Sequence, residues 1–215
     1  MTNGAESPAD SAHLRRVFGH LPTGVVIITG LGLDGELLGM TIGSFASISL
    51  DPPLAGFYIG RASRTWPLMA ARGNFCANVL AASQSDLCWR FAKDAADRSR
   101  FDGLDIGTSR NGSPVLPGAV ATIDCRVQTV HQIGDHDLVV GAVTDLRVLD
   151  AALPSMVFFK GKTGDVRLDS RTLHFSPPPW SAPSSCTPES QNCWLVGSGQ
   201  RQHDNSAFHR SLQSR

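Results

Sequence analysis

Alternating apolar and polar residues dominate the middle of the chain and predict β-strands. Between residues 121 and 129, for example, Ile123 and Cys125 share one face of an extended chain, whereas Asp124 lies on the other. Similar apolar or β-branched runs predict strands at residues 25–29, 37–49, 54–59, 75–80, 136–148 and 156–160. Long strands joined by short turns predict an antiparallel β-barrel.

Three short segments show helical periodicity instead. In the first, four apolar residues recur on one helix face, and we expect this stripe to pack into the core. Its members are Leu14, Val17, Phe18 and Leu21. Ser7 is the expected N-cap of this helix. Two further helices are predicted at residues 66–72, capped by Thr65, and at residues 83–92, opened by a capping box at Ser83.

Composition changes near residue 170 and divides the chain. The whole chain has 215 residues, of which 41% are hydrophobic, enough for one core. Residues 170–215 are rich in serine and proline and show little apolar periodicity, so we expect a disordered tail. The predicted organisation is an N-terminal segment at residues 1–10, a folded domain at 11–169 and the tail.

Charge and missing motifs exclude several classes of protein. Lys+Arg and Asp+Glu both number 19, which argues against a nucleic-acid-binding protein that works through a basic field. Neither a transmembrane run nor a secretory leader is recognisable, so we expect a cytoplasmic protein with no membrane association. Five cysteines without C-x-x-C spacing predict neither a disulfide framework nor a metal site. Dinucleotide-binding, P-loop, metalloprotease and esterase motifs are also missing.

Hydroxyl side chains recur in residues 39–53, at or near alternate positions of a predicted strand. They are Thr41, Ser44, Ser47 and Ser49. Alternate strand residues share one face, so this row could bind a flat polar ligand. The alternative is the ordinary solvent-facing side of an antiparallel sheet.

Two further segments suit anion or redox-ligand binding. In residues 61–65, two arginines and two hydroxyls precede a predicted helix, a combination that suits a phosphate, although ordinary N-capping with solvated arginines is the alternative. In Gly134-Asp135-His136, a tight turn places His136 at the start of a strand. There it could contact an anionic or redox ligand, or be a half-exposed strand histidine.

Taken in order, these segments resemble the flavin reductase family with the FMN-binding split-barrel fold. The resemblance covers about residues 12–168, in which the matching stretches are 21–25, 39–53, 63–65, 75–80 with Gln84, 98–103, 134–136 and 158–161. It implies a mainly β fold: a six-stranded antiparallel split β-barrel with a few short helices, which forms a homodimer.

The resemblance also implies an activity. Such a protein would be an NAD(P)H-dependent flavin reductase that transfers hydride from NADH or NADPH to FMN, or to FAD, and supplies reduced flavin to a partner flavin-dependent monooxygenase. Two alternatives stay open: a non-catalytic flavin- or haem-binding module, and a flavoenzyme that keeps its FMN and reduces another substrate.

Flavin-binding residues are carried over by position in the family's motifs. The expected flavin contacts are Thr41, Ser44, Phe45, Ser47, Ser49, Ser63, Arg64, Thr65, Asn78, Leu80 and Phe101. Within this set, Ser63, Arg64 and Thr65 would hold the phosphate.

The expected nicotinamide contacts are His136, Lys160 and Gly161. Hydride transfer is chemistry of the two nucleotides, so His136 is expected to position the nicotinamide rather than act as a base. Two residues depart from the family pattern: Gly43 stands where members often have a side chain, and Thr163 where many have an aromatic residue.

Overall fold

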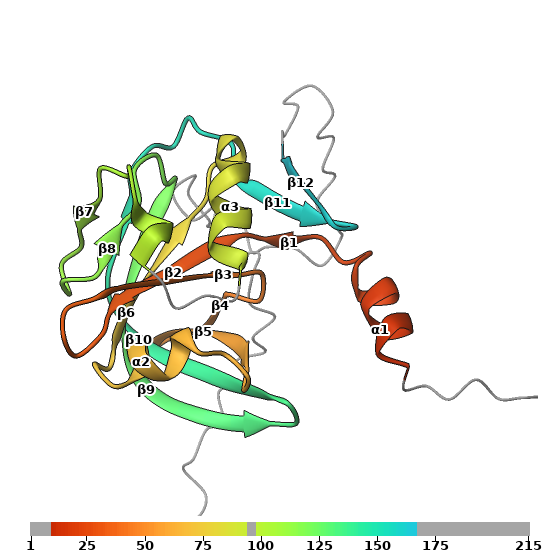
Figure 1. Ribbon diagram of the computed structural model, residues 1–215, viewed down its shortest axis with the longest axis horizontal. Coiled ribbons are helices and arrows are strands. Elements are labelled where there is room, and N and C mark those ends of the chain that lie inside the picture. Colours follow the sequence, from red (N-terminus) through yellow and green to blue (C-terminus); the bar gives the residue numbers. More distant parts are fainter. Residues whose placement is uncertain (1–9, 94–97, 167–215) are drawn as a thin grey trace, which may run out of the picture. The chain divides into compact units, whose positions relative to one another are not determined.

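Seven antiparallel strands form the main sheet of the computed structural model, which describes residues 10–93 and 98–166 (Figure 1). They are β2 (Val26–Leu31), β3 (Leu37–Ile42), β4 (Ala46–Leu50), β5 (Pro53–Gly60), β6 (Asn74–Val79), β9 (Ala121–Ile133) and β10 (His136–Val148). Their order across the sheet is β3-β2-β6-β9-β10-β5-β4. Two strands that are consecutive in the chain, β3 and β4, therefore form the two edges of the sheet.

The mainly β, antiparallel fold is confirmed, but the strand count differs from the expected six. Residues 37–49 form two strands because the chain breaks pairing after Ile42. There, a Cβ on Gly43 would lie 3.1 Å from Oγ1 of Thr23, and Ser44 hydrogen-bonds to the backbone of Tyr58 on β5. The bend predicted at Gly43 is thus a change from one sheet edge to the other.

Two small sheets accompany the main one. One has the order β1-β11-β12, with β1 (Thr23–Gly24), β11 (Met156–Phe159) and β12 (Lys162–Asp165). The other pairs β7 (Gly107–Thr108) with β8 (Pro114–Val115). Sequence periodicity predicted β11 but missed β12, because its residues are polar or glycine and carry no apolar alternation.

Three α-helices and two short 3₁₀ helices complete the described residues. They are α1 (Ser11–Phe18), α2 (Thr65–Ala70), α3 (Ser85–Ala92), η1 (Ala82–Gln84) and η2 (Arg98–Phe101). All three predicted helices form, with different starts. Asp10 caps α1 through a 3.0 Å bond from the Ala12 N–H, while Ser7 lies outside the described residues.

The caps predicted for α2 and α3 were wrong. Thr65 is the first residue of α2, and the side chain of Ser63 accepts the Trp66 N–H at 3.2 Å instead. Before α3, Gln84 rather than a box at Ser83 returns to the backbone and accepts the Ala81 N–H at 2.9 Å.

The core has two parts. Inside the barrel, Phe57 packs edge-to-face against Trp66 and Phe75, with ring centroids 5.5 and 5.4 Å apart. Ile123, Cys125 and Val127 pack in this same cluster, which confirms the alternation predicted for β9. A second cluster lies between the sheet and α3 and contains Ile27, Leu80, Phe91, Phe101 and Leu116.

The apolar stripe of α1 does not join either cluster, so the expectation of core packing was wrong. Its members Leu14, Val17, Phe18 and Leu21 are 42%, 53%, 67% and 61% exposed. Figure 1 shows α1 beside the barrel rather than against it. The helix is joined to the small sheet by a bond from the Lys160 N–H to the Gly19 carbonyl and by the His20 ring against Phe159.

The remaining sequence expectations concern cysteines, metals, membranes and the tail. Cys76, Cys88 and Cys125 are buried as free thiols. Across residues 10–93 and 98–166, no group of three or more His, Cys, Asp or Glu side chains could hold a metal ion. No helix in this part of the chain is long and apolar enough to cross a membrane. The predicted tail, residues 170–215, lies outside the described residues.

Candidate functional site

A rim forms where β5 ends and β10 begins, and it joins two of the predicted motifs. In the sheet register, His136 is the partner of Gly60, the last residue of β5. The Arg61 N–H donates to the Asp135 carbonyl at 3.0 Å, which ties the loop after β5 to the turn before β10. The predicted phosphate loop and the Gly-Asp-His turn are therefore neighbours, although 68 residues separate them in the sequence.

His136 is held by its neighbour in the chain. Its Nδ1 donates to Oδ1 of Asp135 at 2.7 Å, and this hydrogen bond, with the charge of His136, holds the pKa of Asp135 below its usual range. The other ring nitrogen, Nε2, lies 3.9 Å from where a Cβ on Gly60 would be. The imidazole therefore lies over a glycine, half exposed, with one nitrogen engaged and the other directed across the rim.

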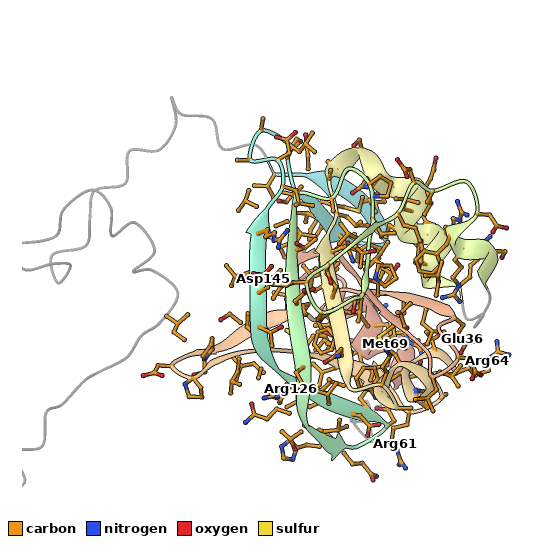
Figure 2. The ribbon with its side chains drawn as sticks, turned by 90° about the vertical axis from the view of Figure 1, so that its left-hand side faces the viewer. Glu36, Arg61, Arg64, Met69, Arg126 and Asp145 are labelled. Atoms are coloured by element: carbon orange, nitrogen blue, oxygen red, sulfur yellow. The ribbon has the colours of Figure 1, made fainter. Side chains whose placement is uncertain are left out.

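The predicted phosphate loop, residues 61–65, combines a hydroxyl with two cations. The Ser63 N–H donates to the Gly60 carbonyl at 2.9 Å, which makes a tight turn directly after β5. Figure 2 shows Arg61 and Arg64 at the surface on the same side of the barrel. Because α2 has only six residues, its dipole is weak and the arginines carry most of the positive charge here. Thr65 is buried, 4% exposed.

Ser44 joins the same rim from the connection between β3 and β4. Its Oγ accepts the Tyr58 N–H at 3.0 Å and donates to the Tyr58 carbonyl at 3.2 Å, so it replaces a backbone partner two residues before Gly60. Phe45 is half-buried against the barrel core. Along β4, Ser47 and Ser49 pair with Ala55 and Leu54 and so lie progressively farther from the rim.

Thr41 faces a different neighbour. On β3, Leu38, Met40 and Ile42 point into the barrel core, whereas Thr41 lies on the side of α3. Its Oγ1 donates to the Cys88 carbonyl at 2.7 Å. The hydroxyl proton is therefore engaged, and its oxygen keeps acceptor capacity for a ligand.

Besides Thr65, three of the predicted flavin residues are fully or almost fully buried. Asn78 donates to Thr29 Oγ1 at 2.9 Å and to the Ile27 carbonyl at 3.2 Å, and its oxygen accepts the Leu116 N–H at 2.9 Å. Leu80 and Phe101 belong to the second core cluster. These side chains pack within the protein and support the sheet. Their direct contact with flavin stays a prediction.

The predicted nicotinamide residues are not brought together in one chain. Lys160 and Gly161 form the turn between β11 and β12, with φ of 49° and 77°. This turn borders a pocket of about 550 Å³ whose lining includes Pro22, Val157, Phe159, Lys160, Lys162 and Asp165. Figure 1 shows the β11–β12 hairpin and the β9–β10 turn at different ends of the barrel, so His136 lies apart from this pocket.

The position of Thr163 also has a structural explanation. Its Oγ1 lies 2.8 Å from Oγ of Ser85, the first residue of α3. One strand away, Phe158 packs edge-to-face against Trp89 with centroids 6.1 Å apart. A side-chain hydrogen bond therefore docks the hairpin on α3 at the position where many family members have an aromatic residue.

Sequence reasoning did not identify Gly60, Asp135 and Tyr58 as residues of this rim. Gly60 provides the open space beneath His136, and Asp135 fixes the ring. Tyr58 contributes only its backbone, which no side-chain pattern can reveal. The Gly-Asp turn signal pointed to Asp135 but not to its role, because that role depends on the fold of the turn.

Comparisons with known proteins identify the family of this chain. The chain matches the family described as flavin reductase like domain over residues 18–167, and it belongs to that family. It is 42% identical over 158 residues to a flavin reductase of Pseudomonas putida, covering 74% of this chain and 91% of the relative. It is 36% identical over 193 residues to a flavin-dependent monooxygenase reductase subunit, HsaB, of Rhodococcus jostii, covering 89% and 95%.

A solved structure shares the fold. The NADH:FAD oxidoreductase SgcE6 of Streptomyces globisporus, in complex with NAD and FAD fragments, superposes with a TM-score of 0.70 at 34% identity. The match covers 76% of this chain and 97% of that protein. The family expected from the ordered sequence motifs is therefore confirmed.

Proposed function

We propose that this protein is an NAD(P)H-dependent flavin reductase, an oxidoreductase that acts on FMN or FAD. The observation that carries the proposal is the rim, where a turn with two arginines and a serine lies against the Gly-Asp-His turn. Family membership and the names of the relatives support the same activity. When both nucleotides are bound, they supply the chemistry, transfer of a hydride from the nicotinamide to the flavin.

The residues of the rim fit a flavin nucleotide by the chemistry of their donors. Ser63 and Arg64, with the backbone of Thr65, hold the phosphate, and Arg61 adds positive charge beside it. Ser44 and Thr41 offer hydroxyl oxygens to the polar edge of the ring and to the ribityl chain. The remaining predicted flavin contacts are Phe45, Ser47, Ser49, Asn78, Leu80 and Phe101.

His136 orients the nicotinamide in this proposal. The Asp135 carboxylate holds Nδ1, so that Nε2 is presented above Gly60 at a fixed angle. Fixed geometry is what hydride transfer requires of a protein, because the reacting atoms must meet at close range. Lys160 and Gly161 stay predicted nucleotide contacts, at a turn that lies apart from His136 in the single chain.

We further propose a homodimer and a partner monooxygenase. The four-residue apolar stripe of α1 is exposed in the single chain, and a second copy is the occupant we infer for it. The relative from Rhodococcus jostii is named as a reductase subunit of a monooxygenase, which supports delivery of reduced flavin to such a partner here. We place the reductase domain at residues 11–169 and the protein in the cytoplasm, where NADH and NADPH are available.

NADH and NADPH oxidation by the purified protein, with and without added FMN or FAD, tests the activity. Turnover that depends on added flavin is the expected result for a reductase that releases its product. Tightly held flavin with turnover of another acceptor would favour a flavoenzyme that keeps its FMN. No nucleotide oxidation above that of free flavin would overturn the proposal.

A further inference from the structure

A buried arginine connects three elements behind the proposed flavin site. Arg100 on η2 is only 6% exposed. Its Nη1 donates to the Gly39 carbonyl on β3 at 2.7 Å and to the Phe91 carbonyl at 3.4 Å, and its Nη2 donates to the Lys93 carbonyl after α3. Guanidinium groups are costly to bury unless their N–H groups find acceptors, and here backbone carbonyls accept from Nη1 and Nη2. One side chain thus fastens β3 to the end of α3.

β3 depends on this connection because it is an edge strand. It pairs with β2 on one side, and the main sheet provides no strand on the other. An edge strand presents backbone groups that must find other partners. For the Gly39 carbonyl that partner is Arg100. Its guanidinium takes the place that a neighbouring strand would have and helps to fix the position of the β3 backbone.

Close packing makes the position of β3 sensitive to α3. A Cβ on Gly39 would lie 2.5 Å from Cε1 of Phe91 and 3.1 Å from Cζ of Phe101, so strand and helix approach as closely as a glycine permits. Two residues further, Thr41 donates to the Cys88 carbonyl at 2.7 Å. A shift of α3 relative to η2 therefore moves the strand that carries Thr41 and leads to Ser44.

We propose that Arg100 is a positioning residue for flavin binding: it holds β3 at the register in which Thr41 and Ser44 meet the ring and the ribityl chain. This inference rests on the proposed function, which places the flavin along β3 and the turn after it. Because the bond from Arg100 reaches β3 at Gly39, two residues before Thr41, we expect its effect mainly at the ring and ribityl end of the ligand.

Arg90 provides a matched control at the same junction. From the last turn of α3, its Nη2 donates to the carbonyls of Ser99 and Asp102 at 2.7 and 2.6 Å. Arg90 therefore joins the two elements from the α3 side, whereas Arg100 joins them from the η2 side. Within the described residues, no hydrogen bond of Arg90 reaches β3. Losing Arg90 weakens the helix junction and leaves the Gly39 contact in place.

The test compares Arg100→Lys with Arg90→Lys in the full-length protein, by titration with FMN and with riboflavin. We expect Arg100→Lys to weaken both ligands by the same factor, about tenfold, because misplacing a binding group by a fraction of an ångström is costly. Arg90→Lys should change both affinities less than about twofold. Arg100→Gln, which keeps an uncharged amide NH2 donor, is the second variant if the first fails to fold.

The outcomes separate this inference from the proposed function. Equal effects of Arg100→Lys and Arg90→Lys, or a lower melting temperature with unchanged affinities, would reduce Arg100 to a structural role and overturn the inference. Ser47→Ala and Arg64→Ala report on the site itself. If both leave flavin affinity intact, the proposed site is wrong; if they weaken binding while Arg100→Lys does not, only the role of Arg100 is wrong.

Discussion

The Asp135–His136 pair shows how two adjacent residues can prepare a site at the surface. The side chains are 95% and 48% exposed, so their ion pair adds little to stability. Its value is geometric, because a histidine with Nδ1 engaged has a defined tautomer and orientation. We therefore expect the pair to contribute to the proposed function of the rim rather than to the stability of the fold.

Replacing His136 by alanine should slow nucleotide oxidation without greatly changing flavin affinity. The imidazole orients the nicotinamide in our account, and loss of orientation lowers the rate by roughly tenfold or more. Steady-state rates with NADH, together with flavin titration, measure the two effects separately. A variant that oxidises NADH at the normal rate would remove His136 from the site.

Burial also determines the chemistry of the cysteines. It raises the pKa of the Cys125 thiol to about 12, with a further contribution from the charge of Asp124, and burial raises the pKa of Cys76 and Cys88. We expect these three thiols to resist alkylation in the native protein at pH 8, as mapped by mass spectrometry.

The same shifts predict alkaline destabilisation. Unfolded thiols ionise near their ordinary pKa, whereas the folded ones stay neutral, so the unfolded state gains stability as pH rises above about 9. Stability should be unaffected by these groups below that pH and should fall above it, as urea unfolding between pH 7 and 10 would show. Rapid labelling of Cys76 or Cys125 in the native protein would contradict the burial.

At the scale of elements, the approach of β3 to α3 is the tightest contact near the site. Gly39→Ala should destabilise the protein by about 1–3 kcal/mol, because the added methyl overlaps the Phe91 ring. Gly24→Ala on β1 is the control, since a Cβ there meets nothing within 4 Å. Urea denaturation measures both, and equal stabilities would show that the helix can move away without cost.

Local patterns predicted the elements whose signals are local. The alternation on β9 and the Gly134-Asp135 turn identified the long hairpin, and Gly43 marked the end of β3. β12 could not be found because its register depends on β11 rather than on its own residues. The stripe of α1 was recognised, but no pattern distinguishes a face buried in the core from one left exposed.

The segments of the proposed site could be identified from the sequence, but their assembly in space could not. The phosphate loop and the Gly-Asp-His turn each carried a local signal, and the resemblance joined them. Their contact through Gly60 is a long-range pairing, which periodicity cannot supply. Burial of Asn78 and Phe101 likewise depends on what the rest of the chain places over them.

For the whole molecule, the exposed face of α1 predicts self-association. Val17→Glu with Phe18→Glu should convert a dimer to a monomer, because charges are costly in an apolar interface. Arg15→Glu, which changes charge on α1 without removing an apolar side chain, is the control. Light scattering during gel filtration gives the mass directly, and a wild-type protein that elutes as a monomer would contradict the dimer.

At the rim, the loop after β5 meets the turn before β10. We propose that the flavin phosphate binds there. Titrating wild-type protein and Arg64→Ala with FMN and with riboflavin tests it most directly. Losing one charge-assisted contact should weaken FMN by about 1.5–3 kcal/mol, roughly ten- to a hundred-fold. Riboflavin, which lacks the phosphate, should bind both proteins alike. An equal loss for the two ligands would contradict the account.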